Sequence, residues 1–292
     1  MTHLERLGAW PARILWLALA LASTGSLSDA LDGRSAAVAL VARIGLALGW
    51  GAGLVALLVP RSSALTAMRV LVPGGLAAAL GALAAGSVAD GSDVATVALA
   101  ALGTAWVLTP WMGDAWVDGS SYGSERRLLL RPPALFSYLL VPVTWVLVVA
   151  GATVGPLLLA ARQWVPGAVL LVLGWAAAAA GGRSLHQLSR RWVVLVPSGM
   201  VIHDPLTMPE AQLFLRRMIS RLGPAPAGTT AHDLTAGAPG LALELDLNEP
   251  ADLLLRTRGR DTATRSTSSV VFTPSRPRHL LDAAAAARIP VA

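Results

Sequence analysis

The chain has 292 residues, of which 54% are hydrophobic and 14% are charged, against about 25% charged residues in an ordinary soluble domain. This composition excludes both a typical soluble globular protein and a disordered one. Cysteine is absent, which excludes disulfides, thiolate metal sites, iron–sulfur clusters and cysteine nucleophiles. The net charge is +6, and every basic residue counted in it is an arginine. Residues 1–189 and residues 190–292 each carry a net charge of +3. No single cationic tail therefore points to nucleic-acid binding.

The first part of the chain, up to about Gly182, consists of apolar runs separated by short polar joints. Because a helix needs roughly 20 apolar residues to cross a bilayer, we expect six of these runs to be membrane spans. The expected spans are Trp10–Ser28, Ala36–Val59, Leu65–Ser87, Val94–Met112, Leu135–Ala161 and Pro166–Gly182. Residues 1–189 are therefore predicted to form a six-helix transmembrane bundle.

The arginines predict how this bundle is oriented, because an arginine excess marks the cytoplasmic side. Ten arginines lie on the N-terminal side of the spans, and three, Arg34, Arg43 and Arg162, lie on the other. We therefore expect a multi-pass membrane protein with both termini in the cytoplasm. The first span also has the charged start and small-residue stretch (Ala20–Ser23) of a signal peptide, so its cleavage stays an alternative.

Two arginines and three glycines inside the spans are candidates for function or packing. Arg43 and Arg69 fall inside or near the ends of the second and third spans, and a charge left in lipid costs about 2.5–3.5 kcal/mol. Such a charge is a candidate functional group, although both side chains could instead snorkel to the headgroups. Gly45, Gly49 and Gly53 form a ladder that lets another helix approach closely, within the monomer or in a homodimer.

The longest loop between spans, residues 113–133, is predicted to be cytoplasmic. Three of its arginines are candidate contacts for anionic headgroups, at about 1 kcal/mol each, namely Arg126, Arg127 and Arg131. Asp114 and Asp118 could instead dock the C-terminal domain, and the sequence leaves both alternatives open. The loop also carries a G-x-S-x-G pattern around Ser121. A nucleophile elbow needs a strand before that serine and a helix after it, and neither is expected here.

After Arg191 the hydrophobic period changes from helical to strand-like. Leucines alternate with Glu244 and Asp246 in one stretch, which is typical of a strand with one buried face. Strands are expected at Trp192–Val196, Met200–His203, Gln212–Leu215, Met218–Leu222, Leu241–Leu247, Leu253–Arg256 and Ser269–Phe272, with a final helix over Ser275–Arg288. Residues 190–292 are therefore predicted to form a small β-rich domain in the cytoplasm.

This order of about seven strands and one terminal helix resembles that of pleckstrin-homology (PH) domains. RRWVVLVPSGMVIHD and FLRRMISRLGP resemble the opening hairpin and third strand of bacterial PH-like domains, and SSVVFTPSRPRHLLDAAAAARI resembles their last strand and capping helix. The resemblance implies a small barrel closed by a helix, which binds peptides or headgroups. The whole chain also resembles multi-pass membrane proteins of high-GC bacteria, which implies the bacterial plasma membrane.

Within the predicted domain, two groups of arginines could form cationic edges that contact lipid or a partner. The first group is Arg216, Arg217 and Arg221, and the second is Arg256, Arg258, Arg260 and Arg265. The first hairpin loop, Pro197–Gly199, contains no basic residue. Phosphoinositide binding is therefore not expected.

The sequence offers no motif for catalysis, for a cofactor or for a metal. The five histidines lack the spacing of a zinc site, and no acidic residue falls deep in a predicted span. We therefore expect a non-catalytic membrane protein whose PH-like domain docks a partner protein or the inner leaflet, and that binds no nucleic acid. The alternative is a transporter or channel for a small or anionic solute, with Arg43 and Arg69 facing a cavity. The oligomeric state is not predicted.

Overall fold

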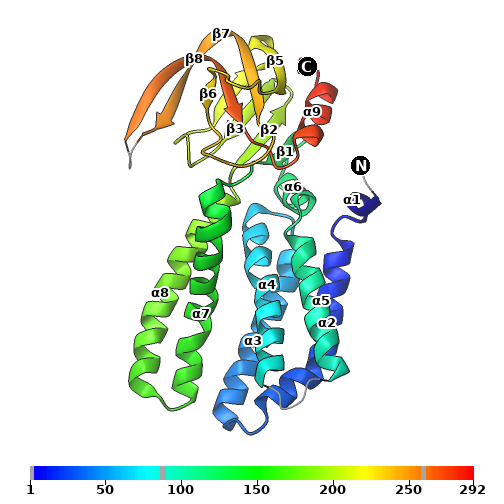
Figure 1. The fold of residues 1–292 in the computed structure, drawn as a ribbon, viewed down its shortest axis with the longest axis vertical. Helices are drawn as coiled ribbons and strands as arrows, with labels where there is room; N and C mark the ends of the chain where they lie inside the picture. Colours follow the sequence, from blue (N-terminus) through cyan, green and yellow to red (C-terminus); the bar gives the residue numbers. More distant parts are fainter. Residues whose placement is uncertain (1–2, 86–89, 258–260) are drawn as a thin grey trace. The chain divides into compact units, whose positions relative to one another are not determined.

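The computed structural model describes residues 3–85, 90–257 and 261–292, and it divides the chain into two compact units (Figure 1). The helical unit comprises Met1–Trp116 and Pro142–Leu185. The sheet-rich unit comprises Val117–Val141 and His186–Ala292. The sequence predicted a single division after residue 189. The structure instead groups the segment between the fourth and fifth expected spans with the C-terminal residues.

The helical unit begins with a short helix, α1 (His3–Leu7), and contains long apolar helices. Five described helices are long and apolar enough to cross a membrane. They are α2 (Trp10–Leu31), α3 (Ala36–Leu58), α4 (Ser62–Ala85), α7 (Val141–Ala160, preceded by a π-helical turn at Phe136–Leu140) and α8 (Trp164–Leu188). The prediction of a multi-pass membrane protein is thus confirmed. The expected end of the third span at Ser87 lies outside the described residues.

The fourth expected span, Val94–Met112, is bent. It consists of α5 (Gly91–Val107) and α6 (Pro110–Asp118), which meet at 61° and make a sixth span only if they are counted together. Pro110 explains the break, because proline has no N–H to donate to the preceding turn and disfavours helical geometry in the residue before it. The structure therefore supports five or six spans.

Indole N–H groups of tryptophans tie the helices of this unit together. Trp16 Nε1 donates to the Trp50 carbonyl at 2.9 Å and Trp50 Nε1 donates to the Trp16 carbonyl at 3.1 Å, which joins α2 to α3 reciprocally. Three further indoles donate to distant carbonyls: Trp106 to Gly8 at 3.0 Å, Trp116 to Ala56 at 2.9 Å and Trp145 to Val70 at 3.0 Å. A hydrocarbon environment offers no water as an alternative partner, so buried donors of this kind require a protein acceptor.

Helices α7 and α8 pack as a hairpin whose contact surface is made of glycines. A Cβ atom added at Gly174 would lie 2.6 Å from the Gly151 carbonyl oxygen, and one at Gly155 would lie 2.5 Å from Leu171 Cα. The glycines of α8 in this contact, Gly167, Gly174 and Gly181, recur every seven residues. The two backbones can approach this closely only because no side chain separates them.

The sheet-rich unit contains two four-stranded sheets and a C-terminal helix. The first sheet has the order β1-β2-β3-β4, with antiparallel neighbours throughout, and the second has the order β5-β7-β8-β6, in which β6 runs parallel to β8. The strands are β1 (Arg126–Leu129), β2 (Trp192–Val196), β3 (Gly199–His203), β4 (Gln212–Leu215), β5 (Ile219–Pro224), β6 (His232–Asp233), β7 (Leu243–Arg256) and β8 (Thr262–Phe272), and the helix is α9 (Pro277–Ala286).

The observed strands differ from the predicted ones in β7, in β8, which begins at Thr262 instead of Ser269, and in β1 and β6, which were not predicted. Leu243, Leu245 and Leu247 are buried as expected, but Leu241 is 54% exposed and Glu244 only 7% exposed, against the predicted alternation. The predicted strands Leu241–Leu247 and Leu253–Arg256 merge into a single strand of 14 residues. Its pairing with β8 shifts register between Asp246 and Ala251. Pro250 lies in this shift, where it does not need to donate to the ladder.

One hydrophobic core joins both sheets and the helix. It includes Leu128 from β1, Phe214 from β4, Leu253 from β7 and Leu280 from α9, all at most 3% exposed. Strand β1 comes from the loop between α6 and α7 and pairs with β2, with Leu129 opposite Trp192. The core is therefore completed only when this loop joins the C-terminal residues.

The predicted barrel is wrong for the described residues, because the two sheets do not close on one another. The chain leaves β4 through a 3₁₀ turn, Arg216–Met218, and enters β5 in the other sheet. In this turn the Arg216 N–H donates to the Ser198 carbonyl at 2.8 Å. The fold that the structure supports is a set of five or six apolar helices with a mostly-sheet unit and a final helix.

Candidate functional site

The loop arginines proposed for headgroup contact are engaged within the sheet-rich unit. Arg126 Nε lies 3.1 Å from Asp118 Oδ2, and the Arg127 backbone N–H donates to Asp118 Oδ1 at 2.8 Å. The Arg127 guanidinium lies 5.8 Å from the ring centroid of Trp192, a distance that permits a cation–π interaction. Arg131 donates to two backbone carbonyls of the same unit at 3.4 Å each. Arg127 and Arg131 thus connect the loop to the C-terminal residues of that unit, whereas Arg126 pairs within the loop segment.

In the first predicted cationic edge, only Arg221 has an acidic partner in the part of the chain that the structure describes. Arg216 donates to the Pro197 carbonyl, and Arg221 lies 3.2 Å from Asp246 Oδ2. Arg217 is exposed. In the second predicted edge, Arg258 and Arg260 lie outside the described residues, whereas Arg256 and Arg265 are exposed on β7 and β8.

A buried ion pair that sequence reasoning missed lies where the loop, β2 and β3 meet. Arg191 Nε and Nη2 donate to the two carboxylate oxygens of Asp204 at 2.8 and 2.7 Å, and the two side chains are 1% and 0% exposed. Arg191 Nη1 also donates to the Arg131 carbonyl at 2.7 Å, and the Leu206 N–H donates to Asp204 at 3.1 Å. Trp192 pairs with His203 across the hairpin, so Arg191 lies opposite Asp204. The register of the predicted hairpin is therefore the feature of the sequence that could have revealed this ion pair.

Beside this ion pair, Trp192 stacks on His203 with ring centroids 5.1 Å apart and planes inclined by 26°. Burial lowers the pKa of His203, Arg190 and Arg127 lower it further, and Asp204 opposes this shift. His203 Nε2 is buried and has no hydrogen-bond partner within the described part of the chain. His203 is therefore held as a neutral aromatic ring in the sheet.

The two intramembrane arginines have different environments. Arg43 is exposed on α3, about 10 Å from the start of that helix at ~1.5 Å per residue. Arg69 of α4 interacts electrostatically with Asp114 of α6. The Asp114 residue is 5% exposed, and Arg69 Nε is buried without a hydrogen-bond partner among the residues described. An acid that the sequence placed in a loop thus lies inside the helical unit.

Two more polar atoms near the bend between α5 and α6 are buried. Thr104 Oγ1 and Trp111 Nε1 have no hydrogen-bond partner in the described ranges. A buried polar atom without a partner carries a desolvation cost of about 1–3 kcal/mol. This end of the helical unit therefore concentrates buried polar atoms without described partners beside two charged residues, Arg69 and Asp114, that interact electrostatically.

The glycine ladder on α3 is only partly used in packing. A Cβ added at Gly53 would meet the Trp16 ring, with the nearest atom at 2.5 Å. Gly45 and Gly49 have nothing within 4 Å of such an atom. The close helix–helix approach lies instead in the α7–α8 hairpin described above, whose seven-residue glycine repeat was the overlooked signal.

The G-x-S-x-G serine lies in the wrong local order for a nucleophile elbow. Ser121 follows helix α6 and precedes strand β1, and its hydroxyl donates to Asp118 Oδ1 at 3.0 Å. Within residues 3–85, 90–257 and 261–292, no group of three or more His, Asp or Glu side chains could hold a metal ion. No family model, no curated protein and no solved structure matches the chain.

Proposed function

We propose that the protein is a non-catalytic, membrane-anchored docking protein of the bacterial plasma membrane, whose sheet-rich unit binds an extended segment of a partner protein. One observation carries this proposal: the outer edge of β8 is open. Strand β6 pairs with β8 only at Val270 and Val271. Residues 262–267 of β8 pair with β7 on one side, and on their other side no described strand pairs with them.

The β7–β8 ribbon supports docking by strand addition. The ribbon consists of residues 251–256 of β7 paired with residues 262–267 of β8. It extends past residues 243–247, the part of β7 that pairs with β5. The buried side of the ribbon comes from β7, where Leu253 is 0% exposed, whereas residues 262–266 of β8 are exposed. An open strand edge presents unpaired N–H and C=O groups, to which an extended peptide adds as a further strand.

The charge of the unit favours an acidic partner. It contains 15 arginines and 11 acidic residues, a net charge of +4. Arg256 and Arg265 are exposed on the ribbon itself. Complementary charge raises the rate of encounter and discriminates among partners.

The pairing of β1 with β2 supports the location of both strands on one side of the membrane. Because a continuous sheet cannot cross a bilayer, residues 126–129 and 192–196 lie on one side of the membrane and α7 and α8 form a pair of crossings. Chain connections to helices enter or leave the unit at residues 117, 141 and 186. We assign this side to the cytoplasm, because ten arginines lie on it against three on the other side.

The PH-like character of the unit remains part of this proposal. Two sheets around one core and a helix packed on it are the features that support it. The unit departs from the PH pattern in its first strand, Arg126–Leu129, which precedes the last two spans. A PH-like unit implies recognition of a peptide or a headgroup, and the open edge favours the peptide.

Site-specific photo-crosslinking tests the proposal. A photoreactive amino acid at Ser266 on the β8 edge is expected to form an adduct with a partner in cells, whereas one at the exposed turn residue Ser198 is not. Arg265→Glu is expected to weaken this adduct, while Arg288→Glu, an exposed arginine after α9, leaves it unchanged. Equal adducts from Ser266 and Ser198, or none from Ser266, would show that the edge is not the docking surface.

A second candidate function is transport of a small anion, favoured by Arg69 and Asp114, which interact electrostatically inside the helical unit. Charged side chains inside membrane helices commonly mark ion pathways. If this pair forms a pathway, Arg69→Ala abolishes chloride flux in liposomes that contain the purified chain. Arg43→Ala removes an exposed arginine from another span and keeps the flux. Absence of flux in the unmodified protein excludes this candidate.

A further inference from the structure

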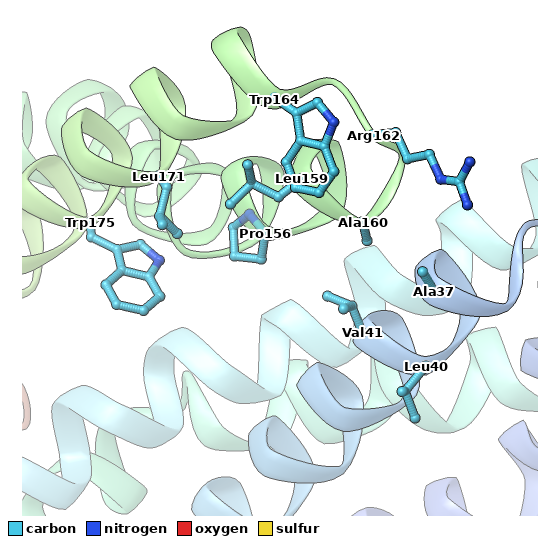
Figure 2. Close-up of a pocket in the computed structure, with 10 residues that line it drawn as sticks. All are labelled: Ala37, Leu40, Val41, Pro156, Leu159, Ala160, Arg162, Trp164, Leu171 and Trp175. Carbon is cyan, nitrogen blue, oxygen red and sulfur yellow. The ribbon is translucent and has the colours of Figure 1, made fainter.

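Helices α3, α7 and α8 border a groove in the helical unit with a volume of about 920 Å³. Figure 2 shows Pro156, Ala160 and Trp175 on the hairpin side of this groove, and Ala37 and Val41 on the side of α3. The remaining lining residues are Leu40, Leu159, Arg162, Trp164 and Leu171. The groove lies at the end of the unit where α3 begins and where a short turn joins α7 to α8.

The lining of the groove matches hydrocarbon rather than water. Nine of its ten lining residues are uncharged, and Arg162 is its only charged residue. All three helices are long and apolar enough to cross a membrane, so the groove opens where acyl chains replace solvent. From Trp164 to Trp175, helix α8 rises about 17 Å at ~1.5 Å per residue. This is close to the depth of one leaflet, half of a hydrocarbon core of about 30 Å.

The charged residue lies at the interface end of the groove. Arg162 occupies the turn between α7 and α8 in a left-handed conformation with φ 61°, and its side chain extends above Ala37 (Figure 2). Its guanidinium has no ion-pair partner among the residues that the structure describes. Trp164, two residues further on, is 67% exposed and is a typical residue of the membrane–water interface.

We infer that this groove is a binding site for an anionic phospholipid of the adjacent leaflet. One acyl chain lies along Pro156, Leu171 and Trp175 on the hairpin side and Val41 on α3. The phosphate accepts hydrogen bonds from the Arg162 guanidinium, which can bind two of its oxygens at once. The turn residues 161–163 carry no acidic side chain, so a headgroup with an additional negative charge is favoured over a zwitterionic one.

Native mass spectrometry of the full chain in detergent tests this inference, with phosphatidylglycerol and phosphatidylcholine of identical acyl chains as probes. The unmodified protein is expected to retain phosphatidylglycerol in preference to phosphatidylcholine. Arg162→Gln is expected to weaken phosphatidylglycerol binding about tenfold, as for the loss of a charge-assisted hydrogen bond. Arg34→Gln, an equal loss of charge in the exposed loop between α2 and α3, is the matched control and should leave binding unchanged.

A second variant tests the apolar part of the site. Ala160→Phe fills the groove and is expected to lower retention of both lipids, with the melting temperature of the protein measured to verify folding. The inference is overturned if the two arginine variants weaken binding equally, if Ala160→Phe folds and binds as before, or if the two lipids bind equally well. Because Arg162→Gln alters only an exposed turn, its result remains interpretable if Ala160→Phe fails to fold.

Discussion

Removal of the Asp204 carboxylate is expected to destabilise the sheet-rich unit by about 3–5 kcal/mol, the typical cost of leaving a buried charge without its partner. The Arg191 side chain is 1% exposed, so water cannot replace the carboxylate. In Asp204→Leu the guanidinium keeps only its bond to the Arg131 carbonyl. Since a whole domain is stable by about 5–15 kcal/mol, this single change removes a large part of its stability.

The double variant Arg191→Met/Asp204→Leu distinguishes the cost of an unpaired buried charge from the cost of altered side-chain packing. Two apolar side chains leave no buried charge, so the double variant is expected to recover at least about 2 kcal/mol relative to the sum of the single variants. Recovery is incomplete because the Arg131 carbonyl and the Leu206 N–H lose their partners. Each such buried group costs about 1–3 kcal/mol when it is unsatisfied.

Pulse proteolysis in urea, applied to the full chain in detergent micelles, measures the free energy of unfolding through cleavage within residues 190–292. The control is the pair Arg221–Asp246, whose side chains are 41% and 29% exposed at an N–O distance of 3.2 Å. Its removal is expected to cost about 0–1 kcal/mol, as for surface ion pairs. If Asp204→Leu costs no more than this control, or if the two single costs add in the double variant, the reasoning from burial is refuted.

Three further predictions concern pH, packing and topology. Burial lowers the pKa of His203, so the contribution of its neutral ring to stability is complete above the unfolded pKa of about 6.5 and is lost as the pH falls below it. The fall in melting temperature from pH 7 to pH 5 should therefore be smaller in His203→Phe than in the unmodified protein. Equal falls in the two proteins would contradict this. Gly174→Leu is expected to lower the melting temperature of the helical unit, because an added Cβ lies 2.6 Å from a carbonyl oxygen. A Cβ added at Gly49 meets nothing within 4 Å, so Gly49→Leu should be tolerated. Similar losses of melting temperature in the two variants would argue against the hairpin contact. Reporters fused after Gly123 and after Ala292 should read the same side of the membrane, the cytoplasm, and opposite readings would rule out the pairing of β1 with β2.

The parts of the fold that sequence reasoning found are those with a local pattern. The short apolar runs in Trp192–Val196 and Gln212–Leu215 predicted strands with the observed bounds, and apolar runs of about 20 residues predicted the long helices. Strand β1 was missed because RRLL is short, rich in arginine and pairs with a strand 63 residues later. No local pattern records a partner at that distance.

The candidate site residues likewise divide into those that a local sequence pattern reveals and those that only the fold reveals. Arg69 was recognised because a charge in an apolar run is conspicuous, but its neighbour Asp114 was assigned to a loop because the bend at Pro110 was not foreseen. Arg191 was counted only toward orientation, although the hairpin register places it opposite Asp204. Sequence alone shows which residues are unusual, and the fold decides which of them meet.

The insertion of β1 into a sheet completed by later residues also orders events during synthesis. Leu129 leaves the ribosome 63 residues before its partner Trp192, an interval of roughly 3–13 s at 5–20 residues per second. During that time β1 lacks its partner strand β2, and in the proposed topology α7 and α8 both enter the bilayer before β2 emerges on the same side. The sheet-rich unit can therefore be completed only after both helices of the last hairpin have been synthesised. A chain that inserts this hairpin wrongly exposes a half-built core to proteases, and pulse-labelled chains truncated before Trp192 should be degraded faster than the full chain.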